Sequence, residues 1–161
     1  MTTLYHGSLE IVTSPEIRRP NRTLDYGEGF YMTSSARQAD AWVRRKLRDD
    51  ITLGYVNIYE YDENMEAVFE TLAFDSPDEA WLDFVMANRM DPAFSHSYDI
   101  VKGPVANDRV YASFALYEAG LIDKRELINE LRAYKLVNQI LLHTERALSS
   151  VKWIDAKEVK K

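Results

Sequence analysis

Four side chains in this sequence have types that can bind or transform a ligand. His6 precedes a glycine in "YHGS", Tyr31 ends "GEGFY", Trp42 follows eleven positions later, and Gln139 opens "QILLH". Aromatic faces attract flat or cationic rings, and imidazole and amide groups hydrogen-bond to hydroxyl groups. Singly, each residue also has a structural explanation, because a histidine at a strand end and half-buried aromatics usually serve packing.

Local patterns predict the elements that position the first three of these residues. We expect a strand at residues 2–8 that ends in a turn. A loop rich in Arg, Pro, Asn and Gly is expected at 17–29, and a second extended segment at 30–33. Ser35 and Gln38 have capping-box spacing, so a helix is expected to begin there. Its buried face is expected to contain Ala36, Ala39, Val43 and Leu47.

The rest of the chain mixes strand and helix patterns. We expect strands at 55–61, 98–106 and 136–143. Helices are expected to begin at Pro77, after a cap at either Asn107 or Asp108, and after Asp123. A short helix from 145 and a final extended segment complete the chain. The inward face of the helix after Pro77 is expected to carry Trp81, Phe84 and Val85. Because no regular βαβ order is present, the pattern predicts an α+β fold with mixed or antiparallel sheets.

Composition narrows the class of protein. The chain has 161 residues, no cysteine and a formal net charge of −6. The length favours one domain over residues 1–161, and the lack of cysteine excludes disulfide scaffolds and thiol catalysis. The negative charge argues against a protein that wraps long nucleic acid. No basic leader and no apolar span of about 20 residues is present, so we expect a cytoplasmic protein that does not insert into a membrane.

Several common catalytic motifs are absent from the sequence. "GEG" lacks the third glycine and the buried strand of a dinucleotide fingerprint, and there is no P-loop, G-x-S-x-G or HExxH motif. His6, His96 and His143 have no metal-ligand spacing, so we expect no metal site. Kinase and Rossmann-type oxidoreductase functions are therefore excluded.

The order of the remaining motifs resembles the ADP-ribosyltransferase superfamily, in the His-Tyr-Glu branch that includes diphtheria toxin and the poly(ADP-ribose) polymerases. "YHGS" is similar to its His-Gly strand, "GFYMTSSARQADAW" to its Gly-x-Tyr strand and following helix, and "QILLHTERALSSVKW" to the strand that carries its third motif. The resemblance covers about residues 3–48 and 135–155. "YDIVKGPVAND" also resembles a segment of an uncharacterised bacterial family within that superfamily, some of whose members are paired with small antitoxin-like proteins.

The resemblance implies an ADP-ribosyltransferase-like fold, with split, mostly antiparallel sheets, flanking helices and a helical insertion at 77–134. It implies NAD as the substrate. Tyr31 and Trp42 would stack on the cationic nicotinamide ring, and His6 would orient a ribose hydroxyl. Further NAD-binding residues implied by the matched segments are Gly7, Ser8, Gly29 and Thr33, with Arg19 and Arg22 on the pyrophosphate.

Gln139 departs from the pattern, because the matching position in this branch usually holds Glu. An amide can orient a ribose hydroxyl, but it adds no negative charge beside a cationic sugar. The departure favours single transfers over polymer synthesis. Glu145 and Asp108 are alternative acids if the alignment is shifted.

The resulting hypothesis is an NAD-dependent mono-ADP-ribosyltransferase, a bacterial toxin or effector with an unknown macromolecular acceptor and an antitoxin protein as partner. The alternative from another class is a degenerate NAD-binding or partner-binding module without transfer activity. An RNA 2′-phosphotransferase and an NAD glycohydrolase share the implied fold and also remain open. The segment 77–134 is where we expect recognition of the acceptor or partner.

Overall fold

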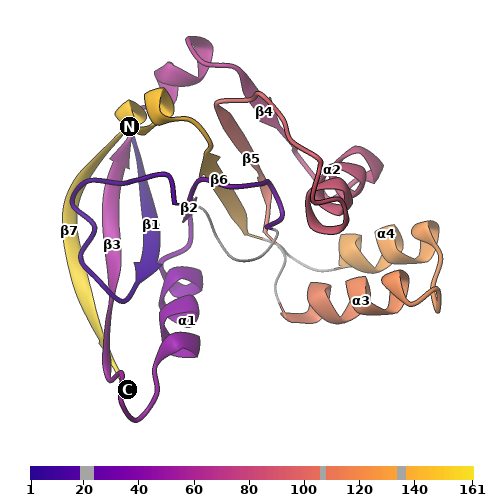
Figure 1. Ribbon diagram of the computed structural model, residues 1–161, viewed down its shortest axis with the longest axis horizontal. Helices are drawn as coiled ribbons and strands as arrows, with labels where there is room; N and C mark the ends of the chain where they lie inside the picture. Colours follow the sequence, from indigo (N-terminus) through magenta and orange to yellow (C-terminus); the bar gives the residue numbers. More distant parts are fainter. Residues whose placement is uncertain (19–23, 106–107, 134–136) are drawn as a thin grey trace.

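The computed structural model describes residues 1–18, 24–105, 108–133 and 137–161. Its strands form one sheet in the order β4-β5-β6-β2-β1-β3-β7 (Figure 1). The strands are β1 (Thr2–Ser8), β2 (Phe30–Thr33), β3 (Leu53–Tyr61), β4 (Thr71–Ala73), β5 (Ile100–Pro104), β6 (Asn138–Leu142) and β7 (Val151–Lys160). The α-helices are α1 (Ala36–Lys46), α2 (Glu79–Met90), α3 (Asp108–Glu118) and α4 (Lys124–Ala133), and the short 3-10 helices are η1 (Glu63–Ala67) and η2 (Glu145–Ser150).

The sheet confirms the α+β class and is mostly antiparallel. Only β4 and β5 pair in parallel among the described strands. The expectation of separate sheets is wrong, because the two halves stay joined where β1 meets β2. That junction is narrow, with one residue pair, Tyr5 opposite Thr33. His6 Nδ1 strengthens it by donating a hydrogen bond to the Tyr31 carbonyl oxygen (2.7 Å).

Side-chain caps set the starts of three helices, close to where the sequence predicts them. Ser35 Oγ accepts from the Gln38 amide (3.2 Å), and Asp123 Oδ1 accepts from the Glu126 amide (2.8 Å). The second helix begins at Glu79 rather than at Pro77, because Asp78 Oδ1 accepts from the Trp81 amide (2.9 Å) and is its cap. Asn107 lies outside the described residues.

The segment 77–134 is not wholly helical, which corrects the insertion expected there. Strand β5 lies inside it and pairs with β6 and β4, so this segment contributes to the sheet itself. The short β4 and the 3-10 helix η1 were not predicted, because three strand residues carry too little periodicity to be recognised. The helix expected from 145 is the 3-10 helix η2.

The helices cover the two halves of the sheet separately (Figure 1). Helix α1 packs on β1 and β3 through Ala39 and Val43, which are fully buried with Val56. Helices α2, α3 and α4 gather beside β5 and β6, where they share a second core that includes Tyr26. Its buried helical members are Trp81, Leu82, Val85, Met86, Val110, Phe114, Leu127 and Leu131.

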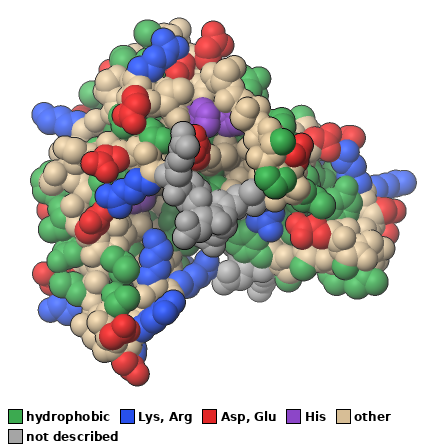
Figure 2. All heavy atoms as spheres, viewed as in Figure 1, with side chains coloured by type: hydrophobic (Ala, Val, Ile, Leu, Met, Phe, Trp, Pro, Cys, Tyr) green, Lys and Arg blue, Asp and Glu red, His purple; other side chains and the backbone are tan. Residues whose placement is uncertain are grey.

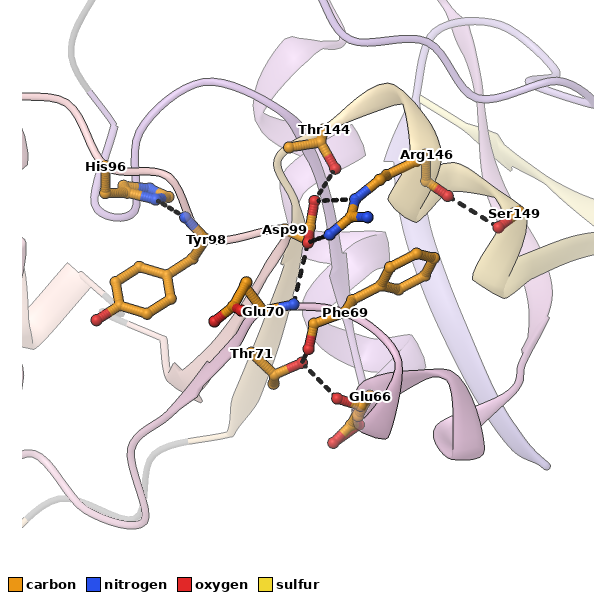
Figure 3. Close-up of polar contacts among 10 residues, drawn as sticks. All are labelled: Glu66, Phe69, Glu70, Thr71, His96, Tyr98, Asp99, Thr144, Arg146 and Ser149. Carbon is orange, nitrogen blue, oxygen red and sulfur yellow. Dashed lines mark hydrogen bonds and ion pairs between the residues drawn. The ribbon is translucent and has the colours of Figure 1, made fainter.

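A buried carboxylate ties the start of β5 to the end of the chain (Figure 3). Asp99, 3% exposed, accepts from Arg146 Nε (2.9 Å) and Nη2 (2.5 Å), from Thr144 Oγ1 (2.6 Å) and from the Glu70 amide (3.0 Å). The hydrogen bonds from the Arg146 guanidinium hold the pKa of Asp99 well below its usual range. The carboxylate is therefore charged and has a structural role, at the junction of β4, β5 and η2.

Two glycines let α1 approach the sheet, and they predict different responses to substitution. A Cβ at Gly7 would lie 2.5 Å from the Ala39 carbonyl oxygen, whereas one at Gly54 would collide with Val43 Cγ1. We expect Gly7→Ala and Gly54→Ala each to destabilise the protein by about 2 kcal/mol. In a Val43→Ala background the cost of Gly54→Ala should fall, while that of Gly7→Ala should persist because its obstacle is backbone. Urea unfolding measures both, and equal costs in that background would contradict the packing.

Candidate functional site

One cavity of about 820 Å³ lies between α1 and the ends of α2 and α3, beside the junction of β1 and β2. The residues that line it include His6, Gly7, Tyr31, Trp42 and Gln139. The structure thus brings together five residues that the sequence proposed from segments far apart in the chain. The volume falls within the range of about 300–1,000 Å³ typical of small-molecule sites.

Strand register explains why Tyr31 and Gln139 share this cavity. Tyr31 lies opposite Leu141, and Thr33 lies opposite Gln139, in the antiparallel β2–β6 ladder. Side chains two residues apart on a strand, and those directly opposite on its neighbour, point to the same face. Tyr31 and Gln139 are therefore diagonal neighbours on one face of the sheet.

His6 is held as a neutral ring at the cavity. Burial lowers the pKa of its imidazole to about 4, so the ring is uncharged near pH 7. Because Nδ1 donates to the Tyr31 carbonyl oxygen, Nε2 is an acceptor, and it makes no hydrogen bond to another described residue. Phe30 supports the ring from one side, with centroids 4.2 Å apart. This tautomer suits a ligand hydroxyl that donates to Nε2.

This buried imidazole predicts a loss of stability in acid. The pKa is below the unfolded value of 6.5, so the unfolded chain binds more protons, and stability falls as pH drops from 6.5 towards 4. Between pH 7 and pH 4.5 the His6 contribution amounts to roughly 2 kcal/mol. His6→Asn keeps an N–H donor but does not titrate. Between pH 7 and pH 4.5 its free energy of unfolding, measured with urea, should therefore fall by about 2 kcal/mol less than that of the wild type. An equal loss in both proteins would contradict a neutral His6.

Tyr31 is fixed by its phenol. The hydroxyl donates to the Gly27 carbonyl oxygen (2.5 Å) and accepts from the Tyr26 amide (3.0 Å), and burial raises its pKa well above 10.0. The hydroxyl is thus neutral and engaged by the 24–29 loop. The ring beside the cavity is consequently preorganised rather than mobile, which favours a role in stacking over one in acid–base chemistry.

Two stacked histidines hold the same loop from outside the cavity. His96 Nε2 donates to the Tyr26 carbonyl oxygen (2.7 Å), and His143 Nδ1 donates to the Glu28 carbonyl oxygen (2.6 Å). Their ring centroids lie 4.1 Å apart. These histidines, left without a role by the sequence, position the loop that in turn positions Tyr31.

Gln139 is the most unusual polar residue at the site. It is 3% exposed, and its Nε2 has no hydrogen-bond partner among the described residues. The Tyr26 hydroxyl lies close enough to Gln139 for the amide to oppose the raised pKa of the phenol, but its hydrogen bonds run from Trp81 Nε1 (2.9 Å) and to the Pro104 carbonyl oxygen (2.8 Å), and Gln139 Nε2 does not reach hydrogen-bond geometry with it. A buried donor without a partner costs about 1–3 kcal/mol. Such a group fits a ligand oxygen that would accept its hydrogen bond.

Removing this amide is predicted to separate stability from binding. Gln139→Met keeps the side-chain length and eliminates the unpartnered donor, so we expect the free energy of unfolding to rise by about 1 kcal/mol or more. The same variant should bind a ligand of this cavity less tightly. Urea unfolding and ligand titration on one preparation check both, with Asn129→Ala on the exposed side of α4 as control. A loss of stability in Gln139→Met would contradict the unpartnered donor.

Charged residues that the sequence did not single out complete the walls. Arg45 and Lys46 reach the cavity from the last turn of α1, and Arg89 Nη1 pairs with Asp25 Oδ1 (3.2 Å). The Arg89 guanidinium also lies over the Tyr111 ring, 5.3 Å from its centroid. Arg45 and Lys46 could have been found from their i+3 and i+4 spacing to Trp42. Arg89 contacts Asp25 and Tyr111, which lie far from it in the sequence, so no local pattern predicts these contacts.

Other proposed binding residues lie elsewhere. Ser8 Oγ accepts from the Glu10 amide (3.2 Å), and Thr33 Oγ1 donates to the Asn138 carbonyl oxygen (3.1 Å), so neither lines the cavity. Gly29 has φ +148° and lacks space for a Cβ, 2.5 Å from the Leu142 carbonyl oxygen, which gives it a backbone role. Gly7 lines the cavity, but its missing side chain makes room for α1 rather than for a ligand.

The remaining candidates are two arginines and two acids. Arg19 and Arg22 lie outside the residues that the structure describes, as does the side chain of Asp108. Glu145, the other alternative acid, is exposed on η2 and does not line the cavity. Of the candidates for the third motif position that the structure describes, Gln139 is therefore the one that lines the cavity.

Comparison with known proteins assigns a family but no activity. Residues 2–153 match the family described as "Protein of unknown function (DUF3990)", and the chain belongs to that family. No curated protein matches the chain. Among the described residues, no helix is both long and apolar enough to span a membrane.

Proposed function

We propose that this protein is an NAD-dependent mono-ADP-ribosyltransferase with an ADP-ribosyltransferase-like fold. The observation that carries the proposal is the convergence of His6, Tyr31, Trp42 and Gln139, from β1, β2, α1 and β6, on one cavity. The same four residues carry the sequence resemblance to the superfamily. Their chemistry fits a flat cationic ring attached to a sugar.

NAD would bind with its nicotinamide beside the two aromatics. A desolvated cation–π contact contributes about 2 kcal/mol, and Tyr31 is already fixed by its phenol. The acceptor Nε2 of His6 would take a hydrogen bond from a ribose hydroxyl, and Gln139 Nε2 would donate to a ribose oxygen. Arg45 and Lys46 line the same cavity and would bind the diphosphate.

The reaction breaks the bond between the ribose C1′ and the nicotinamide nitrogen. The bonding electron pair goes to that nitrogen, so nicotinamide leaves neutral and the sugar develops oxocarbenium character. A nucleophile of the acceptor then forms the new bond to C1′ and loses its proton to solvent. A neutral amide at Gln139 orients the sugar but stabilises its charge weakly, which predicts slow, single transfers.

The second candidate is an NAD-binding module without turnover. It is favoured by one observation, that the third position carries the amide of Gln139 where a carboxylate would stabilise the cationic sugar. If this candidate is right, the protein binds NAD but releases no nicotinamide.

One experiment separates these functions. The intact protein is incubated with NAD labelled in the adenylate phosphate, with and without cell lysate, and nicotinamide release is followed in parallel. Label on a macromolecule supports transfer, free ADP-ribose without lysate indicates glycohydrolysis, and binding by calorimetry without release selects the module. Neither binding nor release at millimolar NAD would reject all three.

The cellular role is proposed from the same resemblance. We propose a cytoplasmic toxin or effector that an antitoxin-like protein neutralises by covering the cavity. Induced expression of the wild-type chain should arrest growth of a bacterial host, and Tyr31→Ala should not. Growth arrest by both proteins would remove the link between toxicity and the cavity.

A further inference from the structure

The charge of this chain is unevenly distributed, with a concentration of cations on α1. Residues 36–48 contain five basic side chains and one acid, Asp40, a net charge of +4 within a chain of net −6. The basic residues are Arg37, Arg44, Arg45, Lys46 and Arg48, and all are exposed. Figure 2 shows several Lys and Arg side chains grouped over α1. The overall charge therefore misrepresents this face.

The basic face is continuous with the candidate site. Arg45 and Lys46 line the cavity itself, and the charge of Lys46 contributes to the lowered pKa of the His6 imidazole. At 100° per residue, Arg37 and Arg44 share the adjoining outward face of the helix, and Arg48 follows two positions after its last residue, Lys46. Arg44 Nη1 donates to the Lys160 carbonyl oxygen (3.3 Å), which brings the lysine-rich end of β7 alongside.

Helix stability explains only part of this arrangement. Cations in the last turn are favoured by the helix dipole, and Arg44 pairs with Asp40 at i,i+4 spacing (2.6 Å). Arg37, however, lies in the first turn, where the dipole disfavours a cation and where α1 has no acid. Within the described ranges, neither Arg37 nor Arg48 has an ion pair. The nearby Asp49 is bridged to Lys161.

We propose that the exposed face of α1 is a docking surface for the phosphodiester backbone of a nucleic acid, which is the macromolecular acceptor. The transfer step rests on the proposed function, whereas docking does not. From Arg37 to Lys46 the helix rises about 14 Å, a distance over which a strand presents several phosphates. A strand on this face would reach the cavity at Lys46, where one of its nucleotides would meet C1′ of the bound NAD.

The chemistry of the face favours a nucleic acid over an acidic protein. Protein interfaces usually centre on a desolvated apolar or aromatic anchor, whereas phosphate contacts need only exposed cations at intervals. The outward face of α1 offers arginines separated by Ala41 and no large apolar side chain. Arginine also binds phosphate through two hydrogen bonds at once.

The test compares two double variants of the full chain with fluorescein-labelled 20-nucleotide single-stranded DNA and RNA. Arg37→Ala/Arg48→Ala removes two cations that do not line the cavity. Arg125→Ala/Arg132→Ala removes two exposed arginines of α4, which lies on the other side of the molecule (Figure 1). Anisotropy titrations over 50–200 mM salt give the affinity and its salt dependence, and circular dichroism verifies folding.

We expect the α1 variant to bind a strand at least tenfold more weakly, with the slope of log K against log salt smaller by about 1.4. The α4 variant should bind as the wild type does. A preference for RNA or DNA would identify the acceptor, and either supports the docking surface. No binding by the wild type at 50 mM salt, equal losses in both variants, or equally tight binding of polyglutamate would overturn it.

The docking surface and the proposed function fail in different ways. NAD binding and nicotinamide release should be unchanged in Arg37→Ala/Arg48→Ala, since these residues are outside the cavity. Strand binding that depends on Arg37 and Arg48 in a protein that never cleaves NAD would refute transfer but leave the surface. NAD cleavage without strand binding would refute the surface alone.

Discussion

Tyr31→Ala is expected to weaken NAD binding about 30-fold or more. The substitution removes the ring proposed to face the nicotinamide cation, and a desolvated cation–π contact of about 2 kcal/mol corresponds to that factor. The loss should appear as a raised Kd in calorimetry and a raised KM for nicotinamide release. Wild-type affinity in a folded Tyr31→Ala variant would contradict the stacking role.

Tyr31→Phe is the matched control for this substitution. It keeps the ring but loses the hydroxyl contacts to Gly27 and Tyr26 that fix the 24–29 loop. We expect NAD affinity to fall by less than about fivefold and stability to fall by about 1 kcal/mol per lost hydrogen bond. If Tyr31→Phe and Tyr31→Ala weakened NAD binding equally, the phenol and its loop would be the determinant and not the ring.

Gln139→Glu is expected to raise the rate of nicotinamide release by about 10- to 100-fold. A carboxylate at this position would stabilise the cationic sugar in the transition state, an electrostatic effect of the size seen when single preorganised groups are changed. The cations Arg45 and Lys46, which line the same cavity, would help to keep the carboxylate ionised despite its burial. The gain should be in kcat, with KM for NAD little altered.

Gln139→Asn serves as control, because it keeps a neutral amide and shortens the reach by one methylene. It should not accelerate nicotinamide release. If Gln139→Glu were folded, bound NAD and released nicotinamide no faster than the wild type, Gln139 would not be the third catalytic position. The degenerate-module interpretation would then be favoured.

Much of the local structure could be predicted because its causes are local. The start of α1 depends on Ser35, and that of α4 on Asp123, within three residues of the amides that they cap. The short strand β2 follows a Gly-rich turn, and β6 contains the apolar run Ile140, Leu141 and Leu142. Each of these features can be identified from a window of a few residues.

The parts that could not be predicted depend on tertiary contacts. Nothing near Arg89 in sequence indicates that it meets Asp25 and Tyr111 at the cavity. The closeness of α1 to β1, which gives Gly7 its role, follows from packing of two elements separated by the 17–29 loop. The basic face of α1 is a different case, because its residues are close in sequence and only the negative net charge, which averages over separate surfaces, concealed it.

A crystal structure of the protein soaked with NAD would show directly whether the cavity is the nicotinamide site. We expect the nicotinamide ring to lie against Tyr31 and Trp42, with ribose oxygens within hydrogen-bond distance of His6 Nε2 and Gln139 Nε2. NAD bound at another surface, or a cavity that stays free of NAD at millimolar concentration, would contradict this expectation.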